Sequence, residues 1–362
     1  MHASTRSGHG RLFAASRACL SVLSRCISGL RFSPAQNNLI AIFLALSGTA
    51  TAGTINYCVY DPSGAQGDYF AMAKDYQLAA KRWGVNLSLL PYNSETLAVE
   101  DFKAGQCDMI GMTGLRMRLF NQFAGTIDAP GAIEDYAEDR VVMGLLASPK
   151  LAPYLVAGDY EVVGAYPLGS GYDYVNDRKL NKMASFAGKR IAVMGWDETE
   201  AIMVEQFGAQ PVLSDITNFG TRFNNGQVDV LIAPIQLYKP FELYKGLGDK
   251  GGIIHRAILQ ISMQQLVRRS KFPPSFAQQS RDYVASTVDH ALGVIRNAEN
   301  EVDPRHWLYM NTAERNDLYK TLRGSRAYLE RRGFYDKRML NILKRVRCKS
   351  MVGDAECSEG DE

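Results

Sequence analysis

A succession of strand, helix, strand, helix and strand occurs twice in this chain, and it constrains the fold more than any other feature. In the first unit, residues 54–60 and 85–90 have the composition of buried strands. Residues 68–83, between them, place their apolar side chains on one face of a helix. A second helix over 94–103 and a third strand over 107–112 complete this unit.

The same order returns after residue 185. Residues 190–194 and 210–213 are predicted strands, and a helix over 197–207 separates them, with Asp197 as its N-terminal cap. A short helix over 217–225 leads to a third strand over 228–233. The sequence therefore contains two β-α-β-α-β units.

Apolar strands that alternate with amphipathic helices are typical of parallel sheets covered on both faces, so the predicted fold class is α/β. We expect two doubly wound α/β lobes, a helical C-terminal part, and a crevice at the carboxyl ends of the strands. A single large doubly wound domain with an apparent duplication is the alternative. Lobe 1 is predicted over 53–150, with later segments returning to it, and lobe 2 over 186–240, with a hinge or crossover over 151–185 between them. A crossover and C-terminal helices follow over 241–348, and they include one long helix over 274–298. The last residues, 349–362, form an acidic tail that is predicted to be disordered.

The first 52 residues have the features of a cleavable secretory signal. They contain five arginines and no acidic residue, then an apolar run over 39–46 and the sequence Ala50-Thr51-Ala52. We expect cleavage after Ala52 and a mature protein in the periplasm. An uncleaved anchor helix is the alternative, and the length of the basic region leaves open a translation start downstream of Met1.

Removal of this signal changes the charge of the protein. The chain has 41 basic and 38 acidic side chains, and 36 basic ones remain without the signal, which gives a net charge of about −2. This balance argues against nucleic acid as a partner.

Four cysteines lie beyond the signal, and none has the C-x-x-C spacing of a zinc or redox motif. An even number in an exported chain indicates disulfides. We predict a Cys58–Cys107 bond, because both residues belong to core strands that the doubly wound order places side by side. Cys348 and Cys357 form the complementary pair, and four free thiols are the alternative.

Three stretches resemble the substrate-binding proteins of TRAP-type transporters, over roughly residues 55–300. They are residues 102–109 (FKAGQCDM), 186–193 (FAGKRIAV) and 223–229 (FNNGQVD), the last followed by Ala233-Pro234 and Tyr238. The resemblance implies a periplasmic-binding-protein-like fold that closes on a small solute and delivers it to a membrane transporter subunit. The chain also resembles, more loosely, the AdeT group, proteins described as components of drug-efflux systems.

One departure from the TRAP pattern concerns the ligand. The arginine with which that family holds a carboxylate corresponds to Ala192 in this sequence. Either Arg116 supplies the cation from the first lobe, or the ligand is uncharged, cationic or zwitterionic.

Loops at the strand ends supply the candidate ligand contacts, because a small-molecule cleft needs aromatic walls and a few hydrogen-bonding groups. Trp196, directly after a buried strand, is the foremost candidate, with a core tryptophan as the alternative. The predicted ligand-binding residues are Tyr60, Asp61, Thr113, Arg116, Trp196, Asp197, Gln236 and Tyr238.

No catalytic, metal or cofactor site is predicted. The histidines are dispersed, and the G-x-G-x-x-G match over 246–251 follows no predicted strand. The predicted function is extracytoplasmic solute binding by a monomer. One alternative is an efflux-associated or sensory periplasmic partner protein, and adjacent genes for a membrane permease would argue against it. The other alternative is an enzyme on the same bilobal scaffold.

Overall fold

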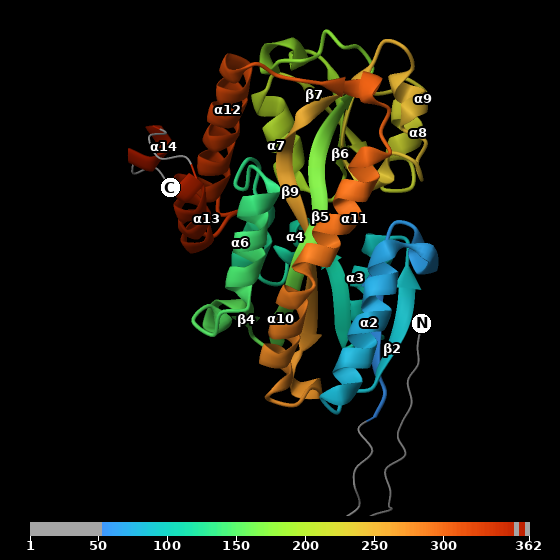
Figure 1. Cartoon of the computed structure of the whole chain (residues 1–362), viewed down its shortest axis with the longest axis vertical. Coiled ribbons are helices and arrows are strands. Elements are labelled where there is room, and N and C mark those ends of the chain that lie inside the picture. The colour runs from blue at the N-terminus through green and yellow to red at the C-terminus, as the bar shows by residue number, and fades with distance from the viewer. Residues whose placement is uncertain (1–52, 351–354, 359–362) are drawn as a thin grey trace, which may run out of the picture. The chain divides into compact units, whose positions relative to one another are not determined.

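The computed structural model describes residues 53–350 and 355–358. The predicted signal over 1–52 lies outside the described residues. Within the described part of the chain, ten strands form one sheet in the order β2-β1-β3-β9-β5-β8-β6-β7, with β10 paired to β9 and β4 to β5 (Figure 1).

Both predicted β-α-β-α-β units are present as three-stranded parallel groups. In lobe 1, β1 lies between β2 and β3. In lobe 2, β6 lies between β7 and β8. These strands are β1 (Ile55–Tyr60), β2 (Leu87–Tyr92), β3 (Met109–Thr113), β6 (Arg190–Met194), β7 (Gln210–Ser214) and β8 (Val230–Pro234).

Two long antiparallel strands join the lobes, where the sequence analysis predicted two separate sheets. The strand β5 (Tyr160–Val175) pairs with β9 (Gly252–Arg268) along most of its length. The far end of β9 pairs with β3 of lobe 1, and the far end of β5 pairs with β8 of lobe 2. Each lobe is therefore continuous with the other through the same two strands. The short strands β4 (Val156–Ala157) and β10 (Trp307–Leu308) lie at their margins.

The helices cover both faces of this sheet (Figure 1). The long helix predicted over 274–298 is two helices, α10 and α11, which meet at Thr287 and pack on β5. The α-helices are α2 (Asp68–Arg82), α3 (Glu95–Lys103), α4 (Gly114–Met117), α5 (Gln122–Gly125), α6 (Tyr136–Leu146), α7 (Glu198–Gln206), α8 (Phe219–Asn224), α9 (Tyr244–Leu247), α10 (Phe276–Ser286), α11 (Val288–Asn300), α12 (Thr312–Arg331), α13 (Lys337–Ser350) and α14 (Ala355–Ser358).

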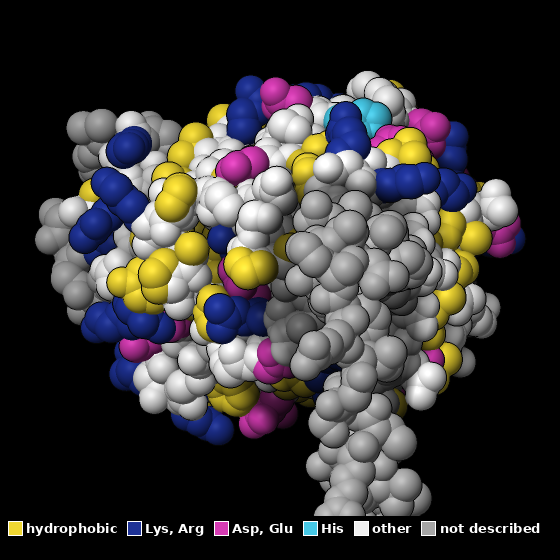
Figure 2. All heavy atoms as spheres, turned by 90° about the horizontal axis from the view of Figure 1, so that it is seen from below, with side chains coloured by type: hydrophobic (Ala, Val, Ile, Leu, Met, Phe, Trp, Pro, Cys, Tyr) yellow, Lys and Arg dark blue, Asp and Glu magenta, His cyan; other side chains and the backbone are white. Residues whose placement is uncertain are grey.

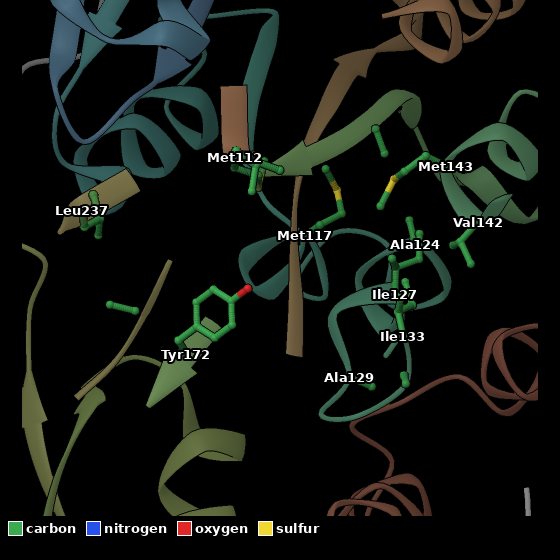
Figure 3. Close-up of a cluster of buried hydrophobic side chains, with 14 of the residues drawn as sticks. Met112, Met117, Ala124, Ile127, Ala129, Ile133, Val142, Met143, Tyr172 and Leu237 are labelled. Carbon is green, nitrogen blue, oxygen red and sulfur yellow. The ribbon is translucent and has the colours of Figure 1, made fainter. Parts of the chain in front are cut away.

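Alternate side chains of each strand enter two separate cores, as a doubly covered sheet requires. In β1, Cys58 belongs to one core, whereas Tyr57 and Val59 belong to the other. Figure 3 shows part of the first core, where Met112 at the end of β3 lies near Met117 of α4. The sheet and its helices thus bury apolar surface on both sides.

Both predicted disulfides are present. The Cα atoms of Cys58 and Cys107 are 5.9 Å apart, and those of Cys348 and Cys357 are 5.6 Å apart. Disorder was predicted for the tail over 349–362, but residues 355–358 form α14, because Cys357 is bonded to α13 and Glu356 is buried. Residues 351–354 and 359–362 of that tail lie outside the described residues.

The surface carries both signs of charge. On the face shown in Figure 2, lysine and arginine side chains alternate with aspartate and glutamate side chains around apolar patches. This mixture differs from the continuous basic surface that is typical of nucleic-acid binding. No helix in the described part of the chain is long and apolar enough to cross a membrane.

Candidate functional site

A cavity lies where the parallel strands of the two lobes end. β3 of lobe 1 pairs antiparallel with one end of β9, and β8 of lobe 2 pairs antiparallel with the end of β5 at the other side of the sheet. Both β3 and β8 run toward the middle of the β5–β9 pair, so the carboxyl ends of the strands in the two lobes face each other. This is the position at which open α/β sheets bind ligands. The cavity is lined by Tyr60, Pro62, Glu95, Thr96, Thr113, Leu115, Leu168, Met194, Trp196, Glu200, Asp215, Ile216, Phe219, Ile232, Pro234, Leu237, Leu259 and Ile261.

Three predicted ligand-binding residues line this cavity: Tyr60, Thr113 and Trp196. Tyr60 ends β1 and Thr113 ends β3, whereas Trp196 comes from lobe 2, two residues after β6. The side chains thus enter the cavity from both lobes.

Arg116 lies in α4 and reaches across from lobe 1 to lobe 2. Its guanidinium carbon is 3.8 Å from the centre of the Trp196 ring, a cation–π contact. Its Nη2 donates to Thr96 Oγ1 at 2.5 Å, and its Nε lies 3.6 Å from Glu95 Oε2. Arg116 is buried, and burial lowers the pKa of its guanidinium. The predicted site arginine is therefore beside the cavity and already has partners.

Glu95, which the sequence analysis did not propose, is the counter-ion of Arg116. It begins α3, and its Oε1 accepts from the backbone N–H of Thr113 at 2.6 Å and from Thr113 Oγ1 at 2.7 Å. Burial raises the pKa of Glu95, although these donors and Arg116 oppose the shift. An acid in the first turn of a helix is ordinarily explained by the helix dipole, so the sequence carried no distinct signal for a site residue.

Two further carboxyl groups, from lobe 2, were also missed. Glu200 lies in the first turn of α7, and its Oε2 accepts from the backbone N–H of Met194 at 2.6 Å. Burial, with Asp197 as a neighbouring acid, raises the pKa of Glu200 to about 8. Asp215 follows β7, and its Oδ1 accepts from the N–H and Oγ1 of Thr217, both at 2.9 Å.

Asp61 and Asp197 do not line the cavity, and each accepts hydrogen bonds from backbone N–H groups in the first turn of a helix. Asp61 accepts from the backbone N–H groups of Ser63, Tyr69 and Phe70, at 2.8–3.1 Å, at the start of α2. Asp197 is the N-cap of α7 and accepts from Thr199 N at 3.0 Å. Their local sequences explain both acids as structural.

Gln236 and Tyr238 also do not line the cavity, although Leu237 between them does. Gln236 donates to the carbonyl of Leu168 at 2.5 Å, and the Tyr238 hydroxyl lies 3.0 Å from His306 Nδ1. Ala192 is buried in the core of lobe 2 and does not line the cavity.

A second arginine connects the lobes beside the cavity. Arg118 forms an ion pair with Asp197, in which the two side chains are 9% and 3% exposed. Its Nη1 also donates to Thr199 Oγ1 at 2.7 Å and to the Tyr335 hydroxyl at 3.3 Å. Asp197 was predicted as a ligand contact, and in the structure it holds lobe 2 against lobe 1.

Among residues 53–350 and 355–358, no group of His, Cys, Asp and Glu side chains is arranged to hold a metal ion. What the cavity offers is an apolar wall, one aromatic face in contact with an arginine, and a few hydroxyl and carboxyl groups. Two α/β lobes on a shared pair of long strands, with such a cavity between them, define a bilobal solute-binding fold.

Comparison with solved structures agrees with this class. The ectoine-binding protein of the TeaABC TRAP transporter from Halomonas elongata superposes with a TM-score of 0.66 over 83% of this chain and 100% of its own, at 13% identity. A TRAP periplasmic solute-binding protein from Desulfovibrio salexigens with bound orotic acid gives a TM-score of 0.63 over 82% of this chain and 99% of its own, at 14% identity. These similarities establish the fold.

Sequence comparison gives the family. The model of the solute-binding protein AdeT 1/2 family matches residues 77–362. The probable solute-binding protein AdeT1 of Acinetobacter baumannii is 42% identical over 304 residues, which are 84% of this chain and 100% of that protein. The chain belongs to the AdeT 1/2 solute-binding protein family, and both resemblances noted in the sequence are confirmed.

Proposed function

We propose that this protein binds a small solute in the interlobe cavity and delivers it to a membrane transporter from the periplasm. The observation that carries the proposal is the cavity itself, which is lined from both lobes at the carboxyl ends of their strands. A ligand that contacts both lobes stabilises the closed arrangement over the open one, and a transporter can recognise that difference.

The relatives support this role. One similar structure is an ectoine-binding protein of a TRAP transporter, and another holds orotic acid. The secretory features of residues 1–52 support a periplasmic location. We propose that the protein acts as a monomer without enzymatic activity, and its membership of a solute-binding protein family supports the absence of catalysis.

Native mass spectrometry of the protein purified from its own periplasm tests the proposal. We expect a co-purified small molecule that is released on denaturation. The variant Trp196→Ala locates the binding site, because it removes an aromatic wall of the cavity. We expect this variant to fold and to carry no co-purified molecule. A folded protein that never carries a small molecule, and binds none added to it, would contradict the proposal.

A further inference from the structure

The acidic groups of the cavity outnumber its basic ones. Three carboxyl side chains line it, from Glu95, Glu200 and Asp215, and none of its described lining residues is a lysine or an arginine. The adjacent cation is Arg116, which lies against the lining residues Glu95, Thr96 and Trp196.

Arg116 is already committed to the protein. Its guanidinium donates to Thr96, lies beside the Glu95 carboxylate and covers one face of the Trp196 ring. Its Nε forms no hydrogen bond with the described residues, but that atom is buried and lies 3.6 Å from Glu95 Oε2, so the guanidinium charge already faces a carboxylate of the protein. Arg116 therefore balances Glu95 and leaves the other two carboxyl groups of the cavity without a cation from the lining.

Glu200 and Asp215 each keep one oxygen for a ligand. Glu200 Oε2 is occupied by the Met194 N–H, and Asp215 Oδ1 is occupied by Thr217. Within the described part of the chain, no hydrogen bond is formed by Glu200 Oε1 or Asp215 Oδ2. Both residues belong to lobe 2 and line the same cavity.

The remaining lining is mostly apolar, from Leu168 and Leu259 of the long strands to Phe219 and Ile232 of lobe 2. A solute that fits must therefore combine an apolar body with a charged end. We infer that the solute is a small organic cation whose ammonium group binds between Glu200 and Asp215 and whose apolar part lies along β5 and β9.

This inference rests on the proposed function and specifies its ligand. An ammonium group supplies three donors and the positive charge that two partly buried carboxyl groups lack. A carboxylate ligand would instead add a negative charge to a cavity lined by three acidic side chains, at a desolvation cost, and the adjacent Arg116 cation already lies beside Glu95. Burial and Asp197 raise the pKa of Glu200 more than Arg118 and the Met194 N–H lower it, which agrees with a carboxyl group whose charge is not fully offset.

Matched ligands separate charge from shape. We would measure binding to the mature protein by isothermal titration calorimetry with 2-phenylethylamine, 2-phenylethanol and 3-phenylpropanoate. A second series with a flexible body is pentan-1-amine, pentan-1-ol and hexanoate. We expect each amine to bind at least about tenfold more tightly than its alcohol or acid partner, because charge-assisted hydrogen bonds are the stronger ones.

Two variants locate the ammonium group. Glu200→Gln keeps the shape of the side chain and removes its charge, so it should weaken amine binding about tenfold. Glu205→Gln removes an exposed charge from the same helix, away from the cavity, and should leave the affinity unchanged. Equal weakening by both variants would overturn the assignment to Glu200.

The outcomes also separate this inference from the proposed function. Tighter binding of an acid than of its amine, lost in Trp196→Ala, would overturn the cation while supporting the solute site. If none of these compounds binds, the molecule released from the natively purified protein decides: an amine supports the inference, and an acid or a neutral solute overturns it. A protein that binds nothing and releases nothing contradicts the proposed function, and the inference with it.

Discussion

The guanidinium carbon of Arg116 lies 3.8 Å from the centre of the Trp196 ring, and the two residues belong to opposite lobes. Two residues further along the chain, Arg118 forms an ion pair with Asp197, the residue after Trp196. The segment that follows β3 thus holds the segment that follows β6 at two adjacent points. The lobes are therefore in contact directly beside the cavity.

Breaking the Arg118–Asp197 pair should favour the open arrangement. The pair is largely buried, and loss of a charge-assisted hydrogen bond costs on the order of 2 kcal/mol, which changes the ratio of open to closed protein about 30-fold. We expect Arg118→Gln to increase the radius of gyration measured by small-angle X-ray scattering.

The control is Arg332→Gln, which alters a pair with Glu198 whose side chains are 49% and 67% exposed, 4.0 Å apart. Such exposed pairs contribute little, so this variant should scatter like the wild type. Identical scattering from Arg118→Gln would mean that the pair does not hold the lobes together.

The two disulfides should contribute unequally to stability. In the chain-entropy model, the Cys58–Cys107 bond, with a sequence separation of 49, stabilises the folded state by about 4 kcal/mol. The Cys348–Cys357 bond, with a separation of 9, contributes about 2.5 kcal/mol by the same relation. Urea unfolding of the two double-alanine variants measures both losses. A greater loss from the C-terminal pair would contradict this ranking.

Much of the fold could be predicted because its units are local. Strand and helix alternate within about 60 residues in each lobe, and that pattern is visible in hydrophobic periodicity. The strands β5 and β9 were missed because long-range contacts define them. Buried Gln260, Ser262 and Gln264 make β9 too polar to resemble a core strand. Their hydrogen-bond partners lie far away in sequence: Ser170 donates to Gln260, Asp128 accepts from Ser262, and the Ala124 carbonyl accepts from Gln264.

The site could be predicted only close to the strand ends. Tyr60 ends β1, Thr113 ends β3 and Trp196 lies two residues after β6, and all three line the cavity. Glu95 and Glu200 lie in the first turns of helices, where an acid is expected for reasons unrelated to a ligand. Conversely, Asp61 and Asp197 resembled site residues because helix caps also follow strand ends.

The C-terminal segment should be fastened by the Glu356 carboxylate. This carboxylate pairs with two buried arginines. Its Oε1 accepts a hydrogen bond from Nη2 of Arg326 at 3.1 Å, and its Oε2 accepts one from Nε of Arg347 at 3.3 Å. Those arginines also donate to the carbonyls of Pro130 and Ala132, so they connect the tail to the body of lobe 1.

Removing one charge from a buried cluster leaves the others uncompensated, so Glu356→Gln should lower the free energy of unfolding by about 3 kcal/mol. The matched change Glu301→Gln alters a pair with Lys239 that is more than half exposed on both sides, and it should cost less than about 1 kcal/mol. Urea unfolding at neutral pH measures both. Equal losses would show that the tail cluster is not part of the cooperative unit.

The affinity for an amine should rise with pH. Glu200 has a pKa of about 8 in the protein without ligand, because burial and the facing Asp197 outweigh the opposing effects of Arg118 and the Met194 N–H. At about pH 6 its carboxyl group is therefore mostly protonated, whereas an alkylammonium ion, with a pKa near that of lysine at about 10, is charged. Binding favours the carboxylate and so releases a proton.

The affinity for 2-phenylethylamine should then increase by up to about tenfold per pH unit from about pH 6, and level off above about pH 8. Calorimetric titrations across this range measure the slope, and Glu200→Gln should flatten it while Glu205→Gln retains it. A pH-independent affinity in the wild type would place the ammonium group away from Glu200. An affinity that falls as the pH rises would overturn the pairing, since 2-phenylethylamine stays charged across this range and ionisation of Glu200 could then only strengthen the contact.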